Sequence, residues 1–219
     1  MSEIYKMSCP LCLNFKIQHY YQDKVRDYWQ CENCLLVFVR PEQFVSTEKE
    51  KAIYDLHENS ANDAGYRNFL NKLLAPLIER LSSGSLGLDF GCGPGPTISV
   101  MMRELDFKIE NYDLFYANNK DLLNKKYEFI TCTEVVEHLH KPFDVLTLLH
   151  GLLTVDGYLG IMTKRLINKN KFRNWHYKND ITHVCFYSDQ TFEFIASNWN
   201  FSLDIIGADV LFLKKNNTI

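Results

Sequence analysis

The stretch Leu86-Gly87-Leu88-Asp89-Phe90-Gly91-Cys92-Gly93-Pro94-Gly95-Pro96 places Gly91, Gly93 and Gly95 at alternate positions directly after an apolar run. Residues 86–90 read as a buried strand, because the run is short, apolar and bounded by glycine. Glycine adopts positive φ readily, and it lets the main chain approach a ligand with no Cβ in between. The stretch therefore predicts a strand that ends in a ligand-binding turn.

A helix is expected directly after this turn. Ile98, Met101, Met102 and Leu105 recur at helical spacing, which is typical of an amphipathic helix. The first N–H groups of a helix have no partner within it. We therefore expect the N-terminus of this helix to face the same ligand as the glycine turn.

This strand, turn and helix resemble motif I of the class I S-adenosylmethionine-dependent methyltransferases. The pattern Asp/Glu-x-Gly-x-Gly-x-Gly is matched by Asp89, Gly91, Gly93 and Gly95, with Cys92 inside the turn. The competing dinucleotide fingerprint requires glycine or alanine at position 96, where this chain has proline. The resemblance implies an α/β fold with a Rossmann-like sheet, mostly parallel with an antiparallel last strand, and these turn residues at the cofactor.

A second cofactor contact is expected at Asp113, which ends the alternating segment 107–113. The two oxygens of a carboxylate can each accept from one of two adjacent hydroxyls, and the resemblance places the ribose-binding acid here. Only residues 114–126 precede the next strand. This is short for the family's third strand and adenine-contacting acid. Strand 3 is therefore expected to be shortened or absent, and Asp121 is a poor candidate for that acid.

Residues 127–133 predict a strand, followed by Glu134-Val135-Val136-Glu137-His138-Leu139. This run resembles the post-strand-4 motif of small-molecule methyltransferases related to ubiquinone-biosynthesis enzymes. Open α/β sheets bind ligands at the carboxyl ends of their strands, so we expect Thr133 and Glu134 near the cofactor and Glu137 and His138 near the acceptor. The alternative for Glu137 and His138 is a first-turn acid favoured by the helix dipole and a histidine that orders the loop.

A basic, aromatic segment follows a predicted helix at 142–153 and a predicted strand at 158–163. It runs from Lys164 to Asp180 and contains Phe172, Trp175 and Tyr177. We expect a substrate lid at the mouth of the cofactor crevice, since a solvated charge run explains lysines but not the neighbouring aromatic residues.

The run Asp180-Ile181-Thr182-His183-Val184-Cys185-Phe186-Tyr187-Ser188 comes next. It resembles the post-strand-5 segment of related methyltransferases, in which a histidine and a tyrosine enter the active site. His183 and Tyr187 are therefore candidate acceptor-side residues, and His183 or His138 is a candidate general base where the acceptor must lose a proton. A helix to Trp199 and strands at 203–206 and 210–213 are expected to close the domain.

Four of the seven cysteines form two Cys-x2-Cys pairs, Cys9/Cys12 and Cys31/Cys34, separated by eighteen residues. Two such turns supply the four sulfurs of a closed tetrahedral zinc site, and the pattern resembles a zinc ribbon. The residues between the pairs include enough β-formers for a short hairpin but too little apolar bulk to fold alone, so we expect structural zinc to stabilise this part.

These features divide the 219 residues into a zinc ribbon (1–45), a linker (46–62) and a methyltransferase domain (63–219). The net charge of −3 gives no global attraction for nucleic acid. The chain has no run of eighteen apolar residues and no charged-then-apolar leader, so we expect a cytoplasmic protein that does not span a membrane.

The sequence thus predicts methyl transfer from S-adenosylmethionine to an acceptor. A small molecule is favoured by the post-strand-4 resemblance. RNA is the second candidate, although residues 1–50 have nearly balanced charge. A protein docked on the zinc ribbon is the third candidate, and a non-catalytic cofactor-binding adaptor is the alternative from another class.

Overall fold

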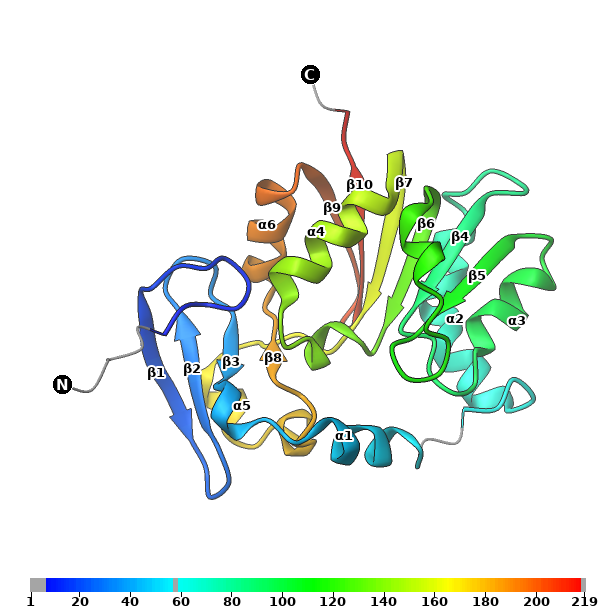
Figure 1. The fold of residues 1–219 in the computed structure, drawn as a ribbon. Coiled ribbons are helices and arrows are strands. Elements are labelled where there is room, and N and C mark those ends of the chain that lie inside the picture. Colours follow the sequence, from blue (N-terminus) through cyan, green and yellow to red (C-terminus); the bar gives the residue numbers. More distant parts are fainter. Residues whose placement is uncertain (1–6, 57–58, 218–219) are drawn as a thin grey trace.

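The computed structural model describes residues 7–56 and 59–217. Three short pieces of the predicted ranges lie outside the described residues. They are residues 1–6 of the zinc ribbon, 57–58 of the linker and 218–219 of the methyltransferase domain. Within the described part of the chain, the strands form two sheets, one of four strands and one of six. Figure 1 shows the smaller sheet to the left of the larger one. No helix in the described residues has the length and apolar content needed to cross a membrane.

The six-stranded sheet carries the predicted fold. Its order is β5-β4-β6-β7-β10-β9, with parallel pairs among the first four strands and antiparallel pairs for β10 with β7 and β9. The strands are β4 (Leu86–Phe90), β5 (Lys108–Tyr112), β6 (Tyr127–Thr133), β7 (Leu153–Met162), β9 (Phe201–Ile206) and β10 (Val210–Lys215). The expected Rossmann-like sheet, mostly parallel with an antiparallel end, is confirmed.

Helices cover both faces of this sheet. Leucines of α2 (Ala64–Ile78) pack with the apolar side chains of α3 (Thr97–Arg103) on one face, and α4 (Pro142–Leu152) and α6 (Asp189–Asn198) contribute to the core on the other. Asp63 caps α2, because its side chain accepts from the Tyr66 N–H at 2.7 Å. The sheet is therefore buried on both sides, as its continuous apolar strands require.

No third strand lies between β5 and β6, a stretch that the structure describes in full. The connection holds a short 3-10 helix, Lys120–Asn124, and β5 is the edge of the sheet. The expected absence of strand 3 is confirmed. Asp121 is exposed on this connection and does not line the cavity described below.

The N-terminal sheet is shared between distant parts of the chain. It orders β1 (Ile17–Gln22), β2 (Asp27–Cys31), β3 (Val37–Val39) and β8 (Cys185–Phe186) with antiparallel pairing. The fourth strand thus comes from the range expected to be methyltransferase domain. One apolar core runs continuously from the N-terminal sheet into the larger sheet, so the two parts pack as one body.

The stretch expected as a linker also differs from a plain linker. It contains α1 (Thr47–Tyr54), whose N-cap Ser46 accepts from the Lys49 N–H at 3.3 Å. Figure 1 shows α1 below the lower ends of the strands of the larger sheet. A helix forms here because a capping serine precedes Glu48 and Glu50, two acids favoured in a first turn.

Candidate active site

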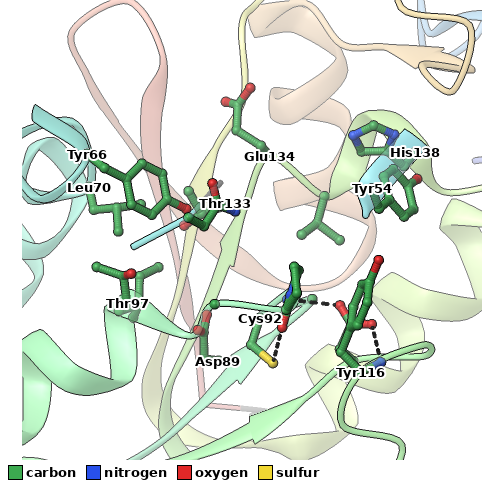
Figure 2. Close-up of a pocket in the computed structure, with 18 of the residues that line it drawn as sticks. Tyr54, Tyr66, Leu70, Asp89, Cys92, Thr97, Tyr116, Thr133, Glu134 and His138 are labelled. Carbon is green, nitrogen blue, oxygen red and sulfur yellow. Dashed lines mark hydrogen bonds between the residues drawn. The ribbon is translucent and has the colours of Figure 1, made fainter. Parts of the chain in front are cut away.

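A cavity of about 420 Å³ opens at the carboxyl ends of β4, β5 and β6, within the size range of small-molecule sites. Figure 2 shows Tyr66 and Leu70 of α2 on one side and Tyr54 and His138 on the other, with Asp89 and Cys92 between them. Ten predicted site residues line the cavity, namely Asp89, Gly91, Cys92, Gly93, Gly95, Asp113, Thr133, Glu134, His138 and His183. Two others, Glu137 and Tyr187, do not.

The glycine turn needs bare backbone at two positions for different reasons. Gly91 has φ of 76°, and a Cβ there would overlap the Val135 side chain. Gly95 has no such φ, but its Cβ would overlap the backbone carbonyl of Asn59, which crosses the turn. The turn is therefore packed between the loop after β6 and the segment that leads into α2.

Asp113 is held rigidly beside this turn. Its Oδ1 accepts from the backbone N–H groups of Phe115 and Tyr116 at 2.8 and 3.1 Å, and its Oδ2 accepts from the Gly93 N–H at 3.0 Å. A carboxylate has about four acceptor positions, so one remains on Oδ2. Asp113 thus fixes the glycine turn and keeps one acceptor position for a ligand hydroxyl.

Two threonine hydroxyls at the cavity have no protein partner within the described residues. Thr97 Oγ1, at the start of α3, and Thr133 Oγ1, at the end of β6, are inaccessible to water and make no hydrogen bond. Buried hydroxyls are normally hydrogen-bonded. Their placement fits a polar ligand such as the cofactor that the motif implies.

Asp89 lies at the end of β4 and is 3% exposed. Burial raises the pKa of its carboxyl to about 7, although Thr131 donates a hydrogen bond to it at 2.7 Å. Burial also raises the pKa of the Cys92 thiol to about 12, so this cysteine is a neutral thiol near pH 7. A cationic ligand in the cavity would favour the ionised form of Asp89.

The opposite end of the cavity is built around His183. Its Nδ1 lies 2.7 Å from the Tyr177 carbonyl oxygen. A carbonyl can only accept, so Nδ1 carries the proton and Nε2 is the basic nitrogen. Asp180 Oδ2 lies 3.8 Å from Nε2, and burial lowers the pKa of His183. The His138 ring stands edge-on to His183 at 4.6 Å, with its Nδ1 3.2 Å from the Thr182 carbonyl.

Glu137 belongs to a buried network beneath this end of the cavity. It is 0% exposed and accepts from Thr163 Oγ1 at 3.0 Å and from the Tyr177 hydroxyl. Burial and the nearby Glu134 raise its pKa, and burial raises that of Glu134. The structure thus places Glu137 behind the lining residues, where it orients Tyr177 and does not face an acceptor.

Tyr187 also differs from the expectation. It is 1% exposed, and its hydroxyl donates to the Val136 carbonyl at 3.0 Å. It directly follows β8, in a stretch where residues 182–188 are all buried. Tyr187 therefore supports the loop after β6 from inside the protein.

The segment expected as a lid packs elsewhere. Phe172 is fully buried, and its ring meets those of Tyr20 at 5.4 Å and Tyr28 at 4.9 Å in the N-terminal sheet. Lys178 is 7% exposed and pairs with Asp23 at 2.8 Å. Of residues 164–180, only Asp180 lines the cavity. Their aromatic side chains form the interface between the two sheets.

Tyr54 and Tyr116 are among the cavity residues that sequence reasoning missed. Tyr54 ends α1, and its ring stands edge-on to His138 at 5.3 Å. The Tyr116 hydroxyl donates to Asp55, the residue after Tyr54, at 2.7 Å. The capping signal at Ser46 could have revealed α1, but nothing in the sequence places this helix over the sheet.

The four N-terminal cysteines converge as predicted from their spacing. Their sulfur atoms all lie within 4.8 Å of one another, with Cys9–Cys34 and Cys12–Cys31 pairs at 3.4 Å. Leu13 and Leu35, one residue after each pair, both have φ of 58°. The two turns thus have matching backbone conformations that aim both thiols of each pair at one point.

Comparisons with known proteins agree with this architecture. A family model described as "Methyltransferase domain" matches residues 64–204. No curated protein matches the sequence. Among solved structures, a 1,6-didemethyltoxoflavin-N1-methyltransferase from Burkholderia thailandensis, with 1,6-didemethyltoxoflavin and S-adenosylhomocysteine bound, is 14% identical with a TM-score of 0.53. The match covers 91% of this chain and 100% of that one.

Two further structures show the same likeness. An S-adenosylmethionine-dependent methyltransferase from Archaeoglobus fulgidus is 16% identical, with a TM-score of 0.51 and coverage of 70% of this chain and 100% of that chain. CalO1, a methyltransferase in calicheamicin biosynthesis with S-adenosylhomocysteine bound, is 10% identical, with a TM-score of 0.52 and coverage of 77% and 61%. At such identities the likeness concerns the fold.

The family match extends over well more than half of the chain, and it contains the glycine turn, Asp113 and His183. It begins at the first residue of α2 and ends within β9. The chain therefore belongs to the methyltransferase domain family and is a class I S-adenosylmethionine-dependent methyltransferase.

Proposed function

We propose that this enzyme methylates a small molecule that is uncharged or cationic. The observation that carries this proposal is the charge of the cavity. Its ionisable lining includes Asp89, Asp113, Glu134 and Asp180, and no lysine or arginine is among the described lining residues. Such a site repels phosphate groups, whereas RNA-binding sites gather positive charge.

The shape of the acceptor end supports a flat acceptor. Tyr54, His138 and His183 place aromatic rings around it, and aromatic rings bind flat or cationic groups well. The similar Burkholderia enzyme was solved with 1,6-didemethyltoxoflavin bound, which also favours a small-molecule acceptor.

Different residues would act at the cofactor end and at the acceptor end of the cavity. Gly93, Asp113 and the hydroxyls of Thr97 and Thr133 would hold the cofactor, whose sulfonium supplies an activated methyl group. His183 would hold the acceptor and take its proton at Nε2, since Nδ1 is committed to the Tyr177 carbonyl. Asp180 would stabilise the resulting imidazolium from 3.8 Å.

We also propose that the N-terminal cysteines hold a structural zinc ion. Zinc–sulfur bonds of about 2.3 Å imply sulfur separations of about 3.8 Å in a tetrahedral site. Two of the sulfur pairs are 3.4 Å apart and all four sulfurs lie within 4.8 Å of one another, which is compatible with that value. The donor set therefore fits zinc, and it contains no open position for catalysis.

Labelling separates the acceptor classes. The purified enzyme is incubated with methyl-labelled S-adenosylmethionine and fractions of cell extract, and the labelled product is treated with nuclease or protease. The proposal expects a product that resists both treatments and is not retained by an anion exchanger. Sensitivity to nuclease or protease would contradict it in favour of RNA or protein, and the absence of any labelled product would indicate a cofactor-binding adaptor.

A further inference from the structure

Arg26 is a buried cation at the edge of the N-terminal sheet, and its guanidinium donates four hydrogen bonds. It lies in the turn between β1 and β2 and is 4% exposed. Asp23 shapes this turn, because its Oδ1 accepts from the N–H groups of Val25 and Arg26, both at 2.9 Å. The turn therefore presents the guanidinium group in a fixed orientation.

The guanidinium donates four hydrogen bonds to one segment about 155 residues away. Its Nη1 donates to the carbonyls of Ile181 at 3.2 Å and His183 at 2.8 Å. Its Nη2 donates to the carbonyls of Asp180 at 2.9 Å and Lys178. Arginine suits this task, since its planar group presents five donors in a rigid arrangement.

The segment held in this way carries the acceptor end of the cavity. Asp180 and His183 line the cavity, and four of the six residues from 178 to 183 give their carbonyls to Arg26. The segment contains only a 3-10 turn at its start, so helix or strand hydrogen bonds do not fix it. The buried Arg26 guanidinium supplies hydrogen bonds to this segment instead.

Other contacts hold the edges of the segment and two points inside it, where His138 Nδ1 lies 3.2 Å from the Thr182 carbonyl and the His183 N–H donates to the Asp180 carbonyl at 3.3 Å. The Lys178 ammonium pairs with Asp23 at 2.8 Å, and the Val184 N–H donates to the Glu137 carbonyl at 2.8 Å. Among the described residues, the carbonyls of Ile181 and His183 accept hydrogen bonds from Arg26 alone. Its loss would therefore release the part of the loop that bears the two cavity residues.

We propose that Arg26 is a positioning residue of the methyl-transfer site, which holds residues 178–183 so that Asp180 and His183 face the cavity. The N-terminal sheet is then part of the acceptor site and not a separate appendage. The role of Asp180 and His183 toward an acceptor rests on the proposed function, whereas the ordering of the loop by Arg26 does not.

The test compares Arg26→Ala and the milder Arg26→Gln with Lys24→Ala, which removes one exposed cation from the same turn. Hydrogen exchange is measured by mass spectrometry in peptides covering residues 176–187 and the glycine turn. Ring-¹⁵N histidine spectra report which nitrogen of His183 carries the proton, with His183→Gln for assignment. Calorimetry with S-adenosylhomocysteine measures cofactor-site affinity.

Both Arg26 variants are expected to raise exchange in 176–187 by about tenfold or more through local opening, with little change in the glycine turn. The His183 spectrum should lose its single Nδ1–H form, and the affinity for S-adenosylhomocysteine should stay within about twofold, since Arg26 does not line the cavity. Lys24→Ala should match the wild type.

Unchanged exchange and an unchanged His183 spectrum in Arg26→Gln would overturn the proposal, even where Arg26→Ala fails to fold. An equal rise of exchange in the glycine turn would also overturn it, because Arg26 would then act on general stability. Failure of the proposed function would look different, since the labelled product would be sensitive to nuclease or protease, or absent, while the loop still responded to Arg26.

Discussion

Replacing Asp113 with alanine tests the cofactor end of the site most directly. The carboxylate accepts three backbone N–H groups, from Gly93, Phe115 and Tyr116, and keeps about one acceptor position for a ribose hydroxyl. A hydrogen bond to a charged group contributes about 1.5–3 kcal/mol. Removing the ligand contact should thus weaken S-adenosylhomocysteine binding about 10- to 150-fold.

The variant also leaves three N–H groups without their acceptor, so its melting temperature should fall as well. Calorimetry is therefore done well below the melting temperature, with Asp113→Asn as a milder change and Asp121→Ala as the matched control. Asp121 is exposed on the same connection and does not line the cavity, so its loss should change neither property. If folded Asp113→Ala binds S-adenosylhomocysteine as tightly as the wild type, our assignment of the cofactor end is wrong.

Three further predictions concern the metal, the base and a buried acid. Cys31→Ser should reduce zinc from about one ion per chain to none and lower the melting temperature, whereas the control Cys92→Ser should keep the zinc. If elemental analysis finds no zinc in wild-type protein purified without chelator, the proposed zinc site is wrong. His183→Ala should lower turnover of the identified acceptor about 100-fold or more while keeping S-adenosylhomocysteine affinity; loss of that affinity with unchanged turnover would make His183 structural. Burial raises the pKa of Asp89 to about 7, so the folded state binds this proton more tightly than the unfolded chain, and the free energy of unfolding should fall as the pH rises from about 4 to about 7. Thermal melts from pH 5 to 8 should show this loss in the wild type but not in Asp89→Asn, and parallel profiles would refute it.

Local patterns were sufficient to predict much of this protein. The glycine turn, the strands on either side of it and the Cys-x2-Cys pairs each depend on residues within a few positions of one another. Their conformations follow from glycine's freedom at positive φ, from apolar periodicity and from ligand spacing. Asp113 could be placed at the cavity because the carboxyl ends of neighbouring parallel strands share one edge of the sheet.

The same reasoning could not distinguish a side chain that faces the cavity from one directly behind it. His138 lines the cavity, but its neighbour Glu137 is fully buried beneath it. Tyr187 lies close in sequence to His183, yet its hydroxyl reaches the Val136 carbonyl inside the core. In an irregular loop, the backbone conformation of a single residue decides whether its side chain faces the cavity or the core. No periodic sequence pattern predicts that conformation.

The sequence by itself therefore determined the fold class, the cofactor turn and the cysteine cluster, because each arises from short-range chemistry. Only the tertiary structure decided that α1 brings Tyr54 to the cavity and that Phe172 packs on the N-terminal sheet. It alone decided that Arg26 holds the loop of His183. These contacts join residues far apart in the chain, and they form only when burial of a common core brings both partners to the same place.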